Sequence, residues 1–102
     1  MPRTGLEGEA DRVALDELGS VLGVETRVVA EYVELGLVRP TAGGGRASLG
    51  VAEVARLSRA LRLARELELH AAAATVLVEL LEERDALRRR LACLEQLAGR
   101  LA

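Results

Sequence analysis

The side chains able to take part in catalysis are few and widely separated. The sequence has one histidine, His70, and one cysteine, Cys93. A hydrolytic triad needs a histidine within hydrogen-bond reach of a nucleophile, and no pattern places the histidine beside Ser20, Ser48 or Ser58. A single histidine and a single cysteine also provide too few ligands for a His- or Cys-based metal site and cannot form an internal disulfide. We therefore expect no enzyme activity, no metal and no cofactor.

Charge is the other chemistry that the sequence offers, and it is unevenly distributed. The 102 residues include 14 basic residues, all arginine, and 16 acidic residues, for a net charge of -2. Residues 1–50 hold eight acidic residues and five arginines, a net of -3, whereas residues 51–102 hold eight acidic residues and nine arginines, a net of +1. A DNA-binding surface needs basic side chains near the phosphates. The acidic first half therefore favours a protein partner over DNA.

A row of arginines occurs in the second half, at every third position. Residues spaced in this way wind about half-way round a helix, so they do not form one flat basic patch. We interpret this row as a solvated helix face; it consists of Arg56, Arg59, Arg62 and Arg65.

The composition predicts a mainly α-helical protein. Hydrophobic residues make up 50% of the chain, with 20 Leu, 17 Ala and 11 Val but one Tyr and no Phe, Trp or Ile. Alanine, leucine, glutamate and arginine are strong helix formers. No apolar run reaches the length of a membrane-spanning helix, and the polar first residues do not resemble a secretory signal. We expect a cytoplasmic protein with no membrane contact.

Two short helices separated by a glycine turn are predicted near the N-terminus. The first fits Asp16 to Leu22, with Asp16 as its N-cap and Gly23 as its end. The second fits Thr26 to Leu35 and ends at Gly36. This arrangement is typical of a helix-turn-helix.

An extended segment and a third helix complete the expected domain. Leu37 to Pro40 leave the second helix, and the glycine-rich stretch Thr41 to Gly50 indicates a flexible loop or a small wing. The third helix is expected from about Val51 to Leu67, followed by a junction at Glu68 to His70. Its predicted inward stripe consists of Val54, Leu57, Leu61, Ala64 and Leu67.

The last predicted helix, from Ala71 to about Leu101, has an apolar seam. Leucines fall mostly at alternating spacings of three and four, with Arg84 and Ala98 at the intervening positions, and these imperfect heptads suggest a coiled coil. We therefore expect a homodimer through this helix; the alternative is an amphipathic helix that folds back on its own domain. The domain organisation is thus a disordered lead at 1–12, a winged helix-turn-helix at 13–69 and a C-terminal dimerisation or interaction helix at 70–102. The expected dimerisation residues are Leu80, Leu87, Leu91, Leu94 and Leu101.

The stretch Leu15 to Pro40, LDELGSVLGVETRVVAEYVELGLVRP, resembles the winged helix-turn-helix of the MerR family. The resemblance implies a MerR-like fold with a long tail helix that dimerises, and a transcriptional regulator that binds DNA. In this alternative, Arg27, Arg39 and Arg46 would contact DNA. DNA-binding members usually carry an Arg-Tyr-Tyr run in the second helix, where this chain has Ala30, Glu31 and Tyr32.

The stretch Leu61 to Leu91, LRLARELELHAAAATVLVELLEERDALRRRL, looks like the tail of chaperone-modulator proteins of the CbpM type, which share the MerR-like fold. This second resemblance implies a protein that binds the J-domain of a DnaJ-like co-chaperone and regulates its work with Hsp70. A J-domain presents a basic helix, for which an acidic surface is a suitable partner. The residues expected to supply that surface are Glu25, Glu31 and Glu34.

Overall fold

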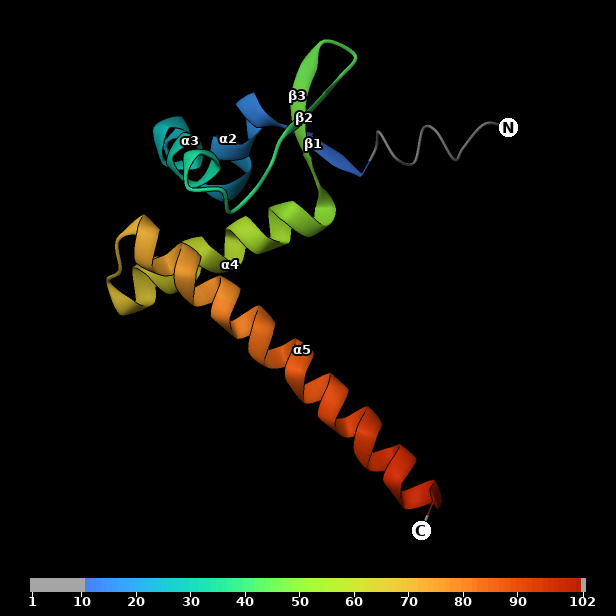
Figure 1. The fold of residues 1–102 in the computed structure, drawn as a ribbon. Helices are drawn as coiled ribbons and strands as arrows, with labels where there is room; N and C mark the ends of the chain where they lie inside the picture. The colour runs from blue at the N-terminus through green and yellow to red at the C-terminus, as the bar shows by residue number, and fades with distance from the viewer. Residues whose placement is uncertain (1–10, 102) are drawn as a thin grey trace.

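The computed structural model describes residues 11–101, as a small winged domain from which one long helix projects (Figure 1). The predicted fold class is confirmed: a winged helix-turn-helix precedes a long C-terminal helix. The predicted disordered lead, Met1 to Arg12, lies outside the described residues except for Asp11 and Arg12. Arg12 is not part of a lead, because it begins the first strand.

A three-stranded antiparallel sheet forms the wing, in the order β1-β3-β2. The strands are β1 (Arg12–Ala14), β2 (Thr41–Gly43) and β3 (Arg46–Gly50). Gly44 and Gly45 join β2 to β3 with φ of 62° and 83°. A two-residue hairpin turn with both φ values positive matches the twist of the strands and favours glycine. The glycine-rich stretch is therefore a β-hairpin wing and not a flexible loop.

Strand β1 was not expected from the sequence. The side chain of its first residue, Arg12, holds it to the rest of the sheet. The Arg12 guanidinium donates from Nε to Ser48 Oγ at 2.8 Å and from Nη2 to the Ser48 carbonyl oxygen at 2.9 Å. It also donates to Thr41 Oγ1. One arginine on β1 thereby holds both strands of the hairpin.

The first helix begins later than predicted. Leu15–Glu17 form a single 3-10 turn, η1, and the α-helix α2 spans Leu18–Leu22. Asp16 does not cap this helix, which has no side-chain cap. Its carboxylate instead accepts a hydrogen bond from the Arg46 guanidinium at 2.7 Å. A long-range ion pair has replaced the expected local cap.

Helices α2, α3 (Thr26–Glu34) and α4 (Val51–Leu67) end in the same way. Each is followed by a residue in the left-handed conformation, Gly23, Gly36 and Glu68, with φ of 72°, 82° and 54°. The next residue then donates its N–H to a carbonyl five positions back, as in the Schellman motif. The three bonds run from Val24 to Gly19, Leu37 to Tyr32 and Leu69 to Ala64, at 2.9, 3.1 and 2.8 Å.

The residue after each left-handed position turns into the domain. Leu37 is buried, and Val24 and Leu69 pack against the core. This reversal explains an error in the predicted stripe of α4: Leu67 is 55% exposed, and Leu69 beyond the turn takes its place. Leu57 and Ala60 are the fully buried residues of α4.

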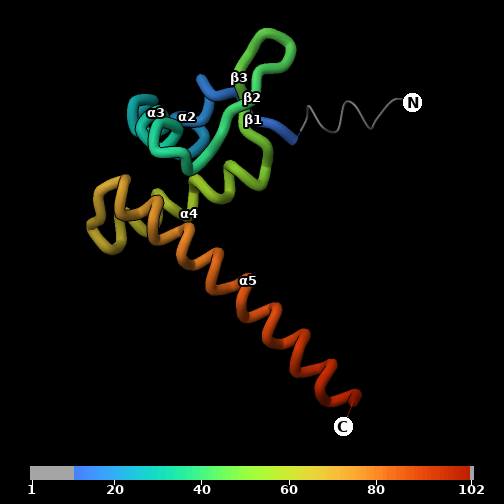
Figure 2. Tube along the Cα trace, viewed as in Figure 1, coloured from blue at the N-terminus to red at the C-terminus, as the bar shows by residue number. Residues whose placement is uncertain are grey.

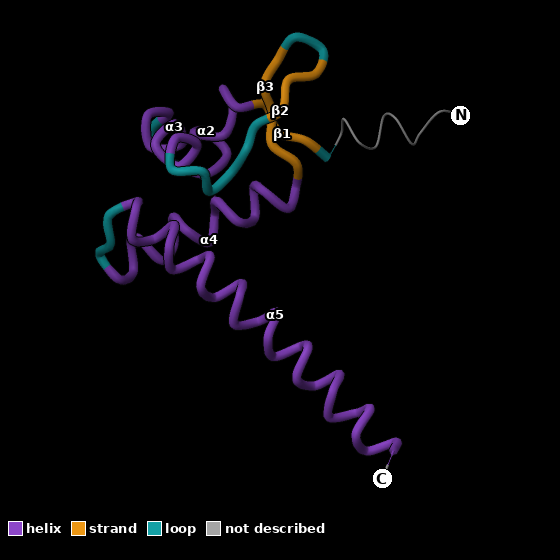
Figure 3. Tube along the Cα trace, in the orientation of Figure 1, coloured by secondary structure: helices purple, strands orange, loops and turns teal. Residues whose placement is uncertain are grey.

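The core brings together the four α-helices of the described residues, strand β3 and the segment that follows α3. Only the beginning of α5 (Ala71–Leu101) contributes to it, through Ala74 and Val78. Beyond this region α5 runs away from the domain as a single uninterrupted helix (Figures 2 and 3). The fully buried apolar residues are Leu18, Val29, Tyr32, Leu37, Val38, Leu49, Leu57, Ala60, Ala74 and Val78.

Among residues 11–101, no helix has the length and apolar character needed to cross a bilayer.

Gly19 gives a test of the α2–α3 turn. It is buried, and a Cβ there would lie 2.7 Å from the carbonyl oxygen of Val24. We expect Gly19→Ala to lower the free energy of unfolding by roughly 1–3 kcal/mol, as overpacking does, in urea denaturation followed by circular dichroism. Gly99→Ala on α5, where a Cβ meets nothing within 4 Å, should not lower stability. Equal stability of the wild type and Gly19→Ala would contradict the close packing described for this turn.

Tyr32 makes stability sensitive to alkaline pH. Burial, and secondarily the negative charge of Glu31, raise the pKa of Tyr32 above its ordinary value of 10.0. Unfolding therefore favours loss of the phenolic proton, so stability present below about pH 10 should fall as the pH rises toward the folded-state pKa. The chain has no lysine, so few other groups titrate in this range.

The test compares urea denaturation of the wild type and Tyr32→Phe from pH 9 upward. We expect the alkaline loss of stability to be largely abolished in Tyr32→Phe and retained in a Cys93→Ser control. The same pH dependence in wild type and Tyr32→Phe would show that another group causes it.

Candidate functional site

The outer face of α3 carries the acidic residues predicted to bind a partner. Val29 and Tyr32 face the core, so Glu31 and Glu34 are left on the solvent side of the helix. Glu25 is the N-cap residue of α3 and is exposed as well. The structure therefore places two of the three predicted carboxylates on the exposed side of α3 and the third, Glu25, at the start of the helix.

Arg27, the basic residue on this face, has a carboxylate partner. Its Nε lies 2.9 Å from Glu25 Oε1, and both side chains are mostly exposed. An exposed ion pair of this kind contributes little to stability. It does offset the positive charge of Arg27, so Glu31 and Glu34 dominate the charge of the α3 surface.

The wing arginine is likewise beside acidic groups. Arg46 Nη2 lies 2.7 Å from Asp16 Oδ1 and 3.9 Å from Glu17 Oε2. A shallow hollow of about 370 Å³ separates the wing from the first residue of α3 and is lined in part by Asp16, Thr26 and Arg46. The sequence suggested helix capping for Asp16, so its place beside the wing was missed.

Arg39 lies in the segment between α3 and the wing. Its backbone N–H donates to both carboxylate oxygens of Glu53, at 2.9 and 3.0 Å, while the residue remains exposed. Glu53 stands in the first turn of α4, where a negative charge suits the positive end of the helix dipole. The three arginines proposed for DNA contact thus each have a carboxylate beside their side chain or backbone.

The tail exposes an apolar stripe. The five predicted dimerisation leucines are between 54% and 88% exposed, and the seam prediction missed Val76 and Leu97, which are also exposed. At helical spacing Val76, Leu80 and Leu87 share one side of α5, opposite Ala74 and Val78 in the core. The stripe therefore faces away from the domain along the whole helix.

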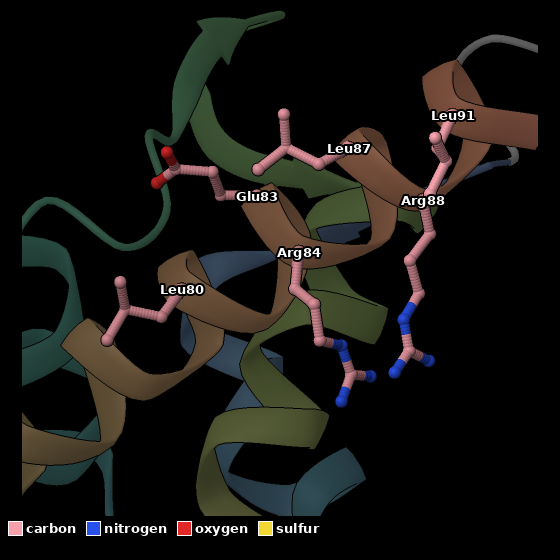
Figure 4. A pocket seen from close by; sticks show the side chains of 6 residues that line it. All are labelled: Leu80, Glu83, Arg84, Leu87, Arg88 and Leu91. Atoms are coloured by element: carbon pink, nitrogen blue, oxygen red, sulfur yellow. The ribbon is translucent and has the colours of Figure 1, made fainter. Parts of the chain in front are cut away.

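Charged residues border this stripe. A shallow hollow of about 360 Å³ is lined by Leu80, Glu83, Arg84, Leu87, Arg88 and Leu91. In Figure 4, Arg84 and Arg88 extend to one side of the helix and Glu83 to the other. The apolar surface thus has a basic border and an acidic border.

The residues considered for catalysis lie on separate elements. His70 is at the α4–α5 junction, where its carbonyl oxygen accepts the N–H of Ala74 at 2.9 Å, and its side chain is exposed. Cys93 is exposed on the tail. Ser48 accepts a hydrogen bond from Arg12, as described above. Within residues 11–101 no group of three or more His, Cys, Asp or Glu side chains is arranged to hold a metal ion.

Comparison with known proteins agrees with this architecture. Residues 13–96 match the family described as MerR HTH family regulatory protein. No curated protein matches the chain. The matched region extends from β1 through the wing and α4 into the tail helix. The chain therefore belongs to the MerR helix-turn-helix family of regulatory proteins.

Proposed function

We propose that this chain is a chaperone modulator that binds the J-domain of a DnaJ-like co-chaperone and regulates its activity with Hsp70. The observation that carries the proposal is the acidic outer face of α3, with Glu31 and Glu34 exposed and Arg27 paired to Glu25. A basic helix of a J-domain is complementary in charge to this face. The resemblance of the tail to the CbpM type gives the proposal its partner.

A DNA-binding regulator is the second candidate, and membership of the MerR family favours it. In this reading Arg27, Arg39 and Arg46 meet the DNA backbone. Against it, Glu31 and Glu34 on the exposed face of α3 would repel phosphate. Arg27 and Arg46 would also exchange their present carboxylate partners for phosphate, so the net gain in attraction would be reduced.

We propose in addition that the protein is a homodimer through the stripe on α5. From Leu87 to Leu101 every residue is exposed, and a helix of this length without a partner is only marginally stable in water. Glu83 and Arg88, on opposite borders of the stripe, have the five-residue spacing at which g and e residues of two parallel helices meet. A second copy therefore supplies both an apolar face and opposite charges.

Reversing the charge of α3 tests the proposed partner. We expect Glu31→Arg with Glu34→Arg to weaken binding to the J-domain by at least about tenfold, because attraction becomes repulsion. Isothermal titration calorimetry at moderate salt measures this change. Glu66→Arg with Glu68→Arg, at exposed residues in the last turn of α4 and just after it, makes the same change in net charge on another helix and should leave binding close to that of the wild type.

The same variants separate the two candidate functions. A DNA-binding regulator should show a strongly salt-dependent gel shift on its own promoter, and Glu31→Arg with Glu34→Arg should strengthen that shift. Wild-type protein that binds no cognate J-domain and shifts the promoter would overturn the chaperone-modulator proposal in favour of DNA binding. Binding that the α3 variant leaves unchanged would move the J-domain site to another surface.

Substitutions on the tail test the dimer. We expect Leu87→Arg with Leu91→Arg to give a monomer in sedimentation equilibrium and to lower the helix content, because two charges would enter the seam. Ala92→Arg with Gln96→Arg adds the same charges at the same spacing on the opposite side of α5, and should remain a dimer. A monomeric wild type at micromolar concentration, or a dimer in both variants, would contradict the proposal.

A further inference from the structure

A single guanidinium connects three parts of the fold. Arg56, on α4, donates from Nε and Nη2 to the two carboxylate oxygens of Glu82 on α5, at 2.8 and 2.7 Å. Its Nη1 donates to the carbonyl oxygen of Leu37, the residue that follows the left-handed turn at the end of α3. Arg56 is thus not part of a solvated row, as the sequence suggested, because its side chain is only 28% exposed.

The contact lies where α5 leaves the domain. Glu82 comes one turn after Val78, the last fully buried residue of α5. From Leu87 onward the helix has no buried residue among those described. The part of α5 from Glu82 to Leu101 is about 28 Å long at the usual rise per residue, so a small tilt at Glu82 moves its end considerably.

The junction between α4 and α5 lies well before the point where α5 leaves the domain. Only Glu68, Leu69 and His70 separate the two helices, and the Glu68 backbone is in the left-handed region. The turn at Leu69 and the burial of Ala74 and Val78 hold the first turns of α5, and the Arg56–Glu82 pair is a further side-chain contact with α4 at the point where α5 leaves the core. A bidentate arginine–carboxylate pair has a fixed planar geometry, which restrains the direction of a helix better than a single contact does.

We propose that Arg56 is a positioning residue that sets the direction of α5 and couples it to the end of α3. Its Nε and Nη2 groups bind Glu82 on α5, and its Nη1 group binds the carbonyl oxygen of Leu37. Because the Leu37 N–H closes the turn onto the Tyr32 carbonyl at 3.1 Å, a shift of Leu37 acts on the last turn of α3. The two candidate partner surfaces, α3 and the tail, are joined through this one side chain.

Distance measurements test the effect on α5. Cys93 is the only cysteine in the chain and is exposed, so it takes one spin label, and Ser20→Cys on α2 takes the second. Labelled protein is mixed with a large excess of unlabelled protein, so that only distances within one chain contribute. We expect a narrow distance distribution in the wild type and a clearly broader or shifted one in Glu82→Gln and Arg56→Met. Glu66→Gln removes an exposed carboxylate of α4 that takes no part in this contact, and should keep the wild-type distribution.

Hydrogen exchange tests the coupling to α3. We expect the amides of Gly36 and Leu37 to exchange faster in Glu82→Gln than in the wild type, although Glu82 lies on another helix. Amides in the middle of α4, around Leu57, provide the reference, because a general loss of stability would accelerate them equally. Arg56→Lys keeps the charge but cannot reproduce the three-way contact, and should also accelerate Gly36 and Leu37.

The outcomes separate a positioning role from a merely stabilising one. Unchanged distances in Glu82→Gln and Arg56→Met would overturn the role in directing α5. Unchanged exchange at Gly36 and Leu37, or acceleration equal to that around Leu57, would overturn the coupling to α3. Neither readout depends on the J-domain, so the outcome is independent of the proposed function.

Discussion

The domain depends on the left-handed turns that reverse the chain after α2, α3 and α4. With no phenylalanine or tryptophan, the core is assembled from Tyr32 and from leucine, valine and alanine, which bury less area each than aromatic side chains do. The left-handed turns at Gly23, Gly36 and Glu68 satisfy helix carbonyls and return an apolar residue to the core within two positions. The turns thereby add apolar side chains to a core that the helices alone would leave smaller.

Because the core is small, apolar and charged surfaces remain exposed and available to partners. The core accommodates only the first turns of α5, so the leucine stripe of the tail remains uncovered. Several arginines already have partners within the chain: Arg12 holds the wing, Arg56 holds the tail, and the exposed Arg27 and Arg46 are beside carboxylates. Because Arg27 is paired with Glu25, the exposed Glu31 and Glu34 give α3 a surplus of acidic groups, and this surplus is the basis for proposing a protein partner.

The sequence was most informative where the pattern is long or where a glycine is obligatory. The bounds of α4 and the start of α5 follow from helical periodicity, and Gly23 and Gly36 end helices as their type predicts. Contacts between distant residues could not be predicted, because spacing along one helix says nothing about a neighbouring helix. Asp16 therefore turned out to pair with Arg46, and Arg56 with Glu82.

Contacts between residues distant in the sequence also decided the wing and the candidate site. A three-residue strand such as β1 is too short to show an alternating pattern, and it is ordered through Arg12 contacts with residues about 30 positions or more away. The exposure of Glu31 and Glu34 followed from the helical position of Val29 and Tyr32. The pairing of Arg27 with Glu25, which increases the relative weight of the two glutamates, required the structure.

The most direct test of the central claim is a nuclear magnetic resonance titration of the isotope-labelled protein with an unlabelled J-domain from the same genome. We expect chemical-shift changes at the backbone amides of Glu31 and Glu34 and the neighbouring exposed positions of α3, with little change from Ala92 to Gln96 on the tail. Changes confined to α5, or no changes at a saturating J-domain concentration, would contradict the proposal that the acidic face of α3 is the partner surface.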